Sequence, residues 1–417
     1  MTPTKPKRLI VFDIEGVLIP KRRYLLFEAA QKLGTLGFLK ILLYGTLYEI
    51  GLIPLESALK KIFKLLKGLT TKDLFQLYKN IPLMPSVKEL FKKLKDAGHT
   101  TALISSGLPT FFIKDLATTL KADYAFGLEL ETVKGHLTGE ISGDVIKPDG
   151  KAIVLKKILQ DTNLSPKDCT IIVDDRNNLP MFPLSKTKIG YNPDFLVTAK
   201  SDYVIKGDLT EMLPILTEDT PKKPHSTLSK NDILRETIHI GSFSIPFIST
   251  YFLNPHITSL IILLITIPYI LSEFLRIRGT NLPITSTITW KTATKPELYE
   301  FATAPIFFAL GIILSLILFP TPINYVLITI LTLGDGFATI FGKTIGRTTL
   351  PFNKGKTLEG SVFGFIFAFS GALLFVNNPI KALIGSTIGI LVELLPLPIN
   401  DNLTIPLTTG LILTLIP

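Results

Sequence analysis

The sequence predicts two domains of different kinds: an α/β domain with a doubly wound parallel sheet and a helical cap, then an all-α polytopic membrane domain of about seven helices. Charge is the first observation, because 35 of the 44 Lys and Arg residues lie in residues 1–235 and only nine lie in 236–417. Apolar patterning is the second. Short apolar runs alternate with lysine-rich stretches in the first part, whereas apolar runs of helical length fill the second. A single soluble globule is therefore excluded, and so is a chain wholly embedded in a membrane.

Three short apolar runs in the first part are expected as buried strands, and each ends in polar residues. They are LIVF (9–12), TTALISS (100–106) and CTIIVDD (169–175). Lysine-rich helices are expected at 86–98 and 150–160, ahead of the second and third runs. Strands that alternate with helices form a parallel sheet, which binds ligands at the carboxyl ends of its strands.

A mostly helical insertion is expected at 24–80, directly after the first strand, within a cap that spans about 20–80. This is where a lid over the first strand's end would lie. Its apolar stretch at 36–55 fits either the cap's own core or a segment that rests on a membrane surface.

The polar residues at the strand ends carry the candidate chemistry. Asp13 ends the first strand and Glu15 follows two residues later, so one carboxylate can attack phosphorus while the other protonates the leaving oxygen. Ser105, in ISSG, ends the second strand, where its hydroxyl and the following amides suit phosphate oxygens. Lys151 opens a helix and can pair with the nucleophile and the phosphate together.

Asp174 and Asp175 end the third strand and, with Asp13, offer oxygen ligands for Mg²⁺. The ordered motifs DIEGVL, ISSG, GKAIVLKKI and VDDRNNLPMF resemble the haloacid dehalogenase (HAD) superfamily, in its phosphoserine-phosphatase-like branch, over about residues 8–216. The resemblance implies cleavage of a phosphomonoester through an aspartyl-phosphate at Asp13, with the Glu15 carbonyl as a further metal ligand.

Two positions depart from that family's pattern. Glu15 stands where the family commonly has an aspartate as its acid/base, and Asn178 stands where the fourth motif usually supplies another aspartate. Asp175 is expected to take over the role of the aspartate that Asn178 replaces. Asn178 is also the best support for a rival interpretation, in which this domain is a non-catalytic, regulatory module that senses a phosphorylated metabolite.

A polar, proline-containing linker is expected at 217–233, and the membrane domain at 234–417. A spanning helix needs about 20 apolar residues. Because the last apolar run is short, the prediction is seven spans, or six without it. The runs lie at 238–254, 257–274, 299–319, 322–342, 358–376, 380–397 and 402–416.

The basic residues predict the topology. With the N-terminal domain in the cytoplasm, the loops after the second, fourth and sixth spans face the cytosol. Eight of the nine basic residues beyond position 235 then fall on that side, and Lys381 faces the other. The chain is therefore expected to be an integral protein of the cell membrane with a cytoplasmic N-terminal domain.

Charged residues at bilayer depth are costly, so each is a functional candidate. With this topology the polar candidates gather at the cytosolic ends of the spans; they are Arg235, His239, Glu273, Arg276, Asp335, Asn353, Lys354, Lys356, Glu359, Glu393, Asp401 and Asn402. Acids that hold metal and lysines that neutralise phosphate suit a Mg²⁺–nucleotide site beside a lipid headgroup. Interfacial anchoring or helix packing is the alternative, and it is preferred for Arg276 or Lys343 taken alone.

Several segments of this half resemble the polyprenol kinase family, which includes dolichol kinase: LRETIHIG, SEFLR, GDGFATIFGKTIGRTTLPFNKGKTLEGSVFGF and LVELLPLPINDNLTIPL. The resemblance implies CTP as phosphate donor, Mg²⁺, and an isoprenoid lipid alcohol as acceptor. It also implies the nucleotide and metal residues, which are Asp335, Lys354, Lys356, Glu359, Asp401 and Asn402.

The whole chain is thus expected to be a bifunctional membrane enzyme, a CTP-dependent lipid-alcohol kinase fused to a HAD phosphomonoesterase. The alternative is a cytidylyltransferase that forms a CDP-lipid, joined to a non-catalytic HAD domain. Nucleic acid is not an expected partner, because the excess lysine is scattered without an aromatic-rich basic stripe. Cys169 is the only cysteine, which excludes an intrachain disulfide and a thiol metal site.

Overall fold

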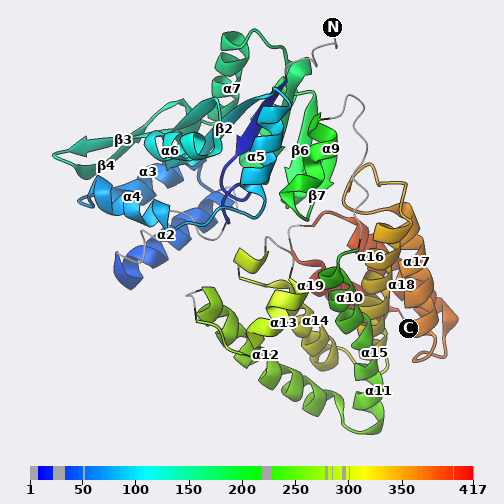
Figure 1. Cartoon of the computed structure of the whole chain (residues 1–417). Helices are drawn as coiled ribbons and strands as arrows, with labels where there is room; N and C mark the ends of the chain where they lie inside the picture. Colours follow the sequence, from blue (N-terminus) through cyan, green and yellow to red (C-terminus); the bar gives the residue numbers. More distant parts are fainter. Residues whose placement is uncertain are drawn as a thin grey trace. The chain divides into compact units, whose positions relative to one another are not determined.

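The computed structural model describes residues 8–21, 33–49, 52–217, 228–277, 280–283, 285–293, 297–299, 301–397 and 399–416. The chain divides into two compact units, Met1–Pro224 and His225–Pro417, and each has its own hydrophobic core (Figure 1). Most of the expected linker falls in 218–227, outside the described residues.

The first unit is built on a seven-stranded sheet in the order β4-β3-β2-β1-β5-β6-β7 (Figure 1). Neighbouring strands are parallel except β3 and β4, which form an antiparallel hairpin. The three strands expected from the sequence are β1, β2 and β5 at its centre, which confirms the α/β parallel sheet. The strands are β1 (Leu9–Asp13), β2 (Thr100–Pro109), β3 (Tyr124–Val133), β4 (His136–Ser142), β5 (Cys169–Val173), β6 (Thr187–Tyr191) and β7 (Tyr203–Ile205).

Amphipathic helices cover this sheet. In α5 the apolar residues Val87, Leu90, Phe91 and Leu94 follow helical spacing and are all buried. The Phe91 ring lies 4.7 Å from that of Phe12 in β1. The helices outside the cap are α5 (Val87–Asp96), α6 (Thr110–Leu120), α7 (Gly150–Asp161), α8 (Phe195–Lys200) and α9 (Leu213–Thr217), with short 3-10 turns η1 (Asp144–Ile146), η2 (Pro166–Asp168), η3 (Arg176–Leu184) and η4 (Leu209–Met212).

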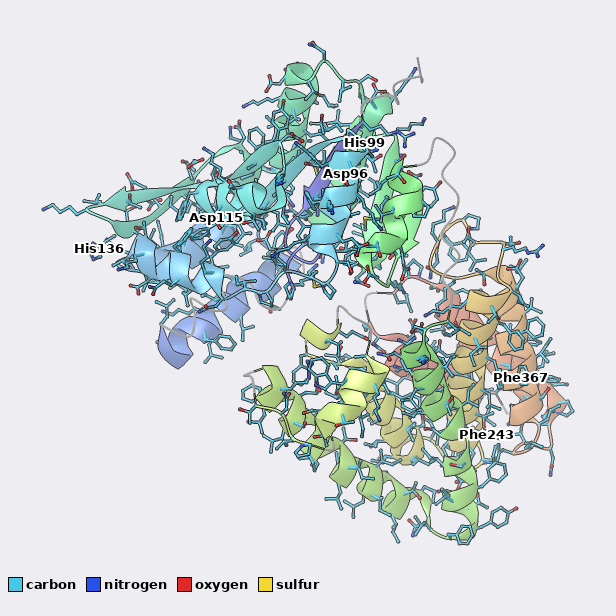
Figure 2. The ribbon with its side chains drawn as sticks, in the orientation of Figure 1. Asp96, His99, Asp115, His136, Phe243 and Phe367 are labelled. Atoms are coloured by element: carbon cyan, nitrogen blue, oxygen red, sulfur yellow. The ribbon has the colours of Figure 1, made fainter. Side chains whose placement is uncertain are left out.

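The expected helical insertion forms α2 (Gly34–Glu49), α3 (Leu55–Leu65) and α4 (Thr71–Lys79). Its beginning, at 22–32, lies outside the described residues. The β3–β4 hairpin also belongs to this region, because the Leu137 N–H donates to the Leu69 carbonyl at 2.9 Å. Figure 2 shows His136 of the hairpin, which lies beside α4. The cap is therefore helical, as expected, with a hairpin that the sequence pattern did not reveal.

The described part of the second unit consists of helices and connecting loops, with one isolated β-bridge between Thr349 and Thr357. Its expected first span is divided between α10 and α11, with the break at Ser242–Phe243, four residues before Pro246. The helices are α10 (Lys230–Gly241), α11 (Ser244–Tyr251), α12 (Pro255–Ile277), α13 (Thr285–Thr292), α14 (Ala304–Leu318), α15 (Ile323–Thr329), α16 (Asp335–Thr344), α17 (Leu358–Ala372), α18 (Pro379–Leu394) and α19 (Asp401–Leu415), with a 3-10 turn η5 (Glu297–Tyr299) and a π-helical turn η6 (Ile330–Gly334).

Two helices among the described residues, Pro255–Arg276 and Ile323–Thr344, are long and apolar enough to cross a membrane. Ala304–Leu318 and Leu358–Ala372 are apolar but shorter. A helical C-terminal region is thus confirmed, while a seven-helix membrane domain stays a prediction.

Small residues bring α16 and α17 close together. A Cβ on Gly360 would lie 2.6 Å from the Ala338 carbonyl oxygen and 2.9 Å from the Gly342 Cα. Farther along the same pair, the rings of Phe337 and Phe367 stack at 3.7 Å. Figure 2 labels Phe367 on α17. Close backbone contact through small residues is how helices associate where no water drives them together.

Candidate active site

The parallel register brings the predicted residues of the first unit to one edge of the sheet. Asp13 pairs with Ile104 of β2, and Phe12 pairs with Ile172 of β5. The sequence predicted that Ser105 ends its strand, but β2 continues to Pro109. Ser105 therefore lies within β2 and Asp174 directly after β5, on either side of Asp13. The carboxyl ends of parallel strands meet in this way because all three run in the same direction.

The Asp13 carboxylate is buried, and its two oxygens have different partners. Oδ1 accepts the Ile14 N–H at 2.8 Å. Oδ2 accepts a hydrogen bond from the Asn178 amide and lies 2.9 Å from the Lys151 ammonium. Asp13 is 3% exposed, so its charge is balanced by buried groups rather than by water.

Lys151 stands at the start of α7 with 4% of its surface exposed. Its ammonium also donates to Asn178 Oδ1 at 2.8 Å. Burial lowers the pKa of Lys151, but the carboxylates of Asp13 and Asp175 outweigh it, so the pKa is raised above the usual value. Lys151 is therefore a permanent cation beside the nucleophile.

Ser105 and Glu15 form a second buried pair. The Ser105 hydroxyl donates to Glu15 Oε2 at 2.6 Å and accepts the N–H groups of Gly107 and Leu108 at 3.1 and 3.0 Å. Burial, then the nearby Asp13 carboxylate, raises the pKa of Glu15 to about 7. A carboxyl group with that pKa holds and releases a proton near neutral pH, as an acid/base must.

Asp13, Asp174 and Asp175 each present an oxygen within 4.8 Å of the others. Asp174 Oδ1 is buried and has no hydrogen-bond partner in the part of the chain that the structure describes. Gly16, at φ +80°, leaves room for this carboxylate, because a Cβ there would collide with it. Clustered carboxylates with an unsatisfied oxygen fit Mg²⁺, as the sequence predicted.

Two residues of this site were not assigned a role from the sequence. Asn178 bridges Asp13, Lys151 and Asp175, the last through a 3.0 Å bond from its amide to Oδ1. Lys21 places its ammonium 2.6 Å from Asp174 and 3.7 Å from Asp175. The sequence marked Asn178 as a departure from a family pattern, but nothing in the pattern singled out Lys21.

In the second unit, several predicted residues meet around the Lys356 ammonium. It lies 2.7 Å from Glu393, 3.6 Å from Asp335 and 4.0 Å from Asp401. Asp335 follows directly after η6. A single π-helical turn inside a helix is frequent at functional sites, because it re-aims the side chains next to it.

His239 and Asn402 complete this group, which we call the Lys356 cluster: His239, Asp335, Lys356, Glu393, Asp401 and Asn402. The His239 Nε2 lies 3.4 Å from Asn402 Oδ1 and 3.9 Å from Asp335. Four helices (α10, α16, α18 and α19) and the loop that carries Lys356 thus contribute to one polar centre.

Other predicted residues of this half have different partners. Arg276 forms a buried ion pair with Glu273, at 2.7 Å, and also donates to the Leu298 carbonyl. Glu359 accepts the Thr348 N–H at 3.0 Å. Arg276 therefore has the helix-packing role that was preferred for it when it was considered alone.

Three more predicted residues take no part in the ion pairs of the Lys356 cluster given above. Arg235 pairs with Glu236 at 3.0 Å, one turn before His239 on α10. Asn353 donates to the carbonyl of Leu394, the residue after Glu393, at 3.0 Å. Lys354 is half-buried in the same loop.

Comparison with known proteins places the first unit in a family. The haloacid dehalogenase-like hydrolase family matches residues 10–183. A phosphoserine phosphatase of Archaeoglobus fulgidus is 34% identical over 191 residues, which cover 46% of this chain and 54% of that protein. One of Methanocaldococcus jannaschii is 29% identical over 210 residues, 50% of this chain and 97% of that one.

A solved structure, the substrate-bound complex of a phosphoserine phosphatase, is 28% identical with a TM-score of 0.47, over 50% of this chain and 98% of the other. Each of these matches covers about half of the present chain. Because the family match spans residues 10–183, the N-terminal half of the chain is a haloacid dehalogenase-like hydrolase domain, similar in sequence to phosphoserine phosphatases.

Proposed function

We propose that the N-terminal unit is a Mg²⁺-dependent phosphomonoesterase that acts through an aspartyl-phosphate at Asp13. The observation that carries the proposal is the buried Asp13–Lys151 pair with the Glu15–Ser105 pair beside it. Lys151 places a permanent cation beside Asp13, and the Glu15 carboxyl group, with its pKa raised to about 7, can hold or release a proton near neutral pH. A carboxylate beside a cation suits a nucleophile, and a carboxyl group with that pKa suits an acid/base.

In the first step an oxygen of Asp13 forms a bond to phosphorus while the bond from phosphorus to the ester oxygen breaks. Glu15 gives its proton to that oxygen, and the alcohol leaves. The Ser105 hydroxyl and the Lys151 ammonium are placed to hold the phosphate oxygens. Asp13, Asp174 and the Glu15 carbonyl, with Asp175 in support, would hold Mg²⁺, which would supply positive charge to the phosphoryl group.

In the second step the Glu15 carboxylate takes a proton from a water molecule whose oxygen forms a bond to phosphorus. The bond from phosphorus to Asp13 breaks, which restores the Asp13 carboxylate and releases inorganic phosphate. Glu15 thereby regains the proton that it gave up in the first step. Lys151 stabilises the returning Asp13 charge.

The test is turnover by the full chain in lipid with Mg²⁺, on p-nitrophenyl phosphate, phosphoserine and lipid phosphates. Asp13→Asn should abolish turnover of every substrate. Asp96→Asn, on the exposed end of α5 (Figure 2), is the matched control and should turn over at the wild-type rate. No turnover by the wild-type protein would favour a binding module instead.

For the C-terminal unit we propose a CTP-dependent kinase that transfers the γ-phosphate to an isoprenoid alcohol in the membrane. Its support is the Lys356 cluster, where Asp335 and Asp401 lie within 4.0 Å of one half-buried ammonium. Acids for Mg²⁺ and a lysine for phosphate are what phosphoryl transfer requires. The proposal keeps the expected placement in the cell membrane, with the N-terminal unit in the cytoplasm.

CTP labelled in turn at the γ- and α-phosphate tests this proposal, with a polyprenol as acceptor. Label that reaches lipid only from the γ position supports the kinase, and Asp335→Asn should then abolish it. Label that reaches lipid from the α position, when a lipid phosphate is supplied, would instead indicate a cytidylyltransferase.

A further inference from the structure

Helix α2 of the cap is apolar on the side that faces away from its own unit. Leu36, Leu39 and Leu43, spaced by three and four residues, are 66%, 59% and 53% exposed. Residues at this spacing share one face of a helix. Contiguous exposed apolar surface marks an interaction site. The exposed face of α2 is therefore a candidate contact surface.

The opposite face of α2 points inward. Ile41 is buried and packs on Ile62 of α3, with Tyr44 beside them. Tyr48 follows one turn after Tyr44, and burial, then the nearby Asp175, raises its pKa to about 12. One face of α2 thus packs within the cap, with Tyr48 near Asp175, while Leu36, Leu39 and Leu43 stay exposed.

Exposed lysines lie on the helix next to α2. Lys60, Lys61, Lys64 and Lys67 lie on or directly after α3, which packs on α2, and all are exposed. Lys61 lies over the Tyr44 ring at 5.4 Å. Lys60 and Lys64 have Glu56 and Glu140 as partners at 2.7 and 3.5 Å, which leaves α3 and its end net positive.

We propose that α2 lies in the headgroup region of an anionic lipid bilayer, and that the active site of this unit acts on phosphomonoesters of membrane lipids. An apolar helix face with lysines on the neighbouring helix binds anionic bilayers through both buried area and charge. The same chain carries two helices long enough to cross a membrane, so a bilayer is always at high effective concentration.

The geometry also connects the bilayer to the chemistry. Nine residues separate Leu39 from Tyr48, which is about 14 Å along a helix at 1.5 Å per residue. A lipid whose phosphate lies at Asp13 can therefore leave its chain in the bilayer along α2. This inference rests on the proposed phosphatase activity and names its substrate class.

The first experiment measures the depth of α2. Cys169 is the only cysteine and is 1% exposed, so a new surface cysteine can be labelled selectively. Leu39→Cys carries an environment-sensitive fluorophore in the full chain, reconstituted in nanodiscs with 30% anionic lipid and a fraction of lipids that bear a quencher. Asp96→Cys on α5 is the matched control.

Quenching at position 39 that exceeds the control at least threefold is the expected result. Equal quenching at both positions, or none at 39, overturns the proposal. A label at 39 that is shielded from water without lipid quenching also overturns it, because protein then covers α2.

The second experiment measures the substrate class. Wild type is compared with a variant that carries Leu36→Gln, Leu39→Gln and Leu43→Gln, and with the control Val133→Gln, which alters an exposed apolar residue of the hairpin. The substrates are geranylgeranyl phosphate in vesicles and p-nitrophenyl phosphate in solution, each with Mg²⁺. We expect the triple variant to lower the kcat/KM ratio of lipid to soluble substrate about tenfold, and the control to leave it unchanged.

An unchanged ratio in the triple variant overturns the inference while the phosphatase proposal stands. If the wild-type protein hydrolyses neither substrate, the phosphatase proposal itself fails.

Discussion

The buried Asp13–Lys151 pair makes a quantitative prediction for Lys151→Met. The variant keeps the shape of the side chain but removes the ammonium that lies 2.9 Å from Asp13 and 2.8 Å from Asn178. Both members of the pair are nearly inaccessible to water, at 3% and 4% exposure. Removing one partner of such a pair leaves a buried charge uncompensated, which costs about 3–5 kcal/mol.

Hydrogen exchange followed by mass spectrometry can measure this cost in the full chain. One factor of ten in the opening equilibrium corresponds to about 1.4 kcal/mol, so we expect the slow amides of β1 (Leu9–Asp13) to exchange about 10²- to 4 × 10³-fold faster without Mg²⁺. Phosphatase activity should fall below one thousandth of wild type, because the nucleophile and the phosphate both lose their cation.

Lys157→Met is the matched control, since it lies on the same helix and pairs with Asp144 at 2.6 Å in an exposed position. Exposed pairs contribute about 0–1 kcal/mol, so exchange in β1 should change less than about fivefold. Equal effects of the two variants would refute the reasoning, because burial would then have no bearing on the strength of the pair.

Three further predictions concern both units. The pKa of Glu15 is about 7 and an acid works only while protonated, so the rate of alkyl phosphate cleavage should fall as the pH rises through 7. Glu15→Gln should lose this pH dependence and accumulate phosphorylated enzyme, which intact mass spectrometry can detect. Gly16→Ala should raise the Mg²⁺ concentration needed for half-maximal activity at least tenfold, because residue 16 has a positive φ and a Cβ there would collide with the Asp174 carboxylate. An unchanged Mg²⁺ requirement would argue against this metal site. Lys356→Met should leave Glu393, which is 1% exposed, without its ion-pair partner and destabilise the second unit by about 3–5 kcal/mol. The fluorescence of Trp290 should then be lost at a lower temperature on heating, and an unchanged transition temperature would contradict the pairing.

Much of the first unit could be predicted from the sequence, because local pattern is sufficient for its central elements. LIVF, TTALISS and CTIIVDD are short, apolar and bounded by polar residues, so they are strands wherever they lie. Strands β3, β4, β6 and β7 were not predicted. They alternate with polar residues or are short, and their strand conformation depends on pairing with neighbours that the sequence alone does not identify.

The Lys356 cluster illustrates the opposite case. The sequence identified Asp335, Lys356, Glu393 and Asp401 as polar residues at the ends of apolar runs. The same reasoning grouped Arg276 and Glu359 with them, because a one-dimensional pattern gives depth along a helix and not the face on which a residue lies. Packing of α10, α16, α18 and α19 selects which of these side chains meet.

The sequence by itself determined the division into a charged and an apolar half, the central parallel strands and the order of the four HAD motifs, since each depends on residues close together in the chain. Tertiary structure alone decided that Asn178 bridges Asp13 and Lys151, that Lys21 meets Asp174, and that one face of α2 stays exposed. These features join residues up to 165 positions apart. Only the folded chain brings such distant groups within hydrogen-bonding range, because that closeness comes from packing and not from local propensity.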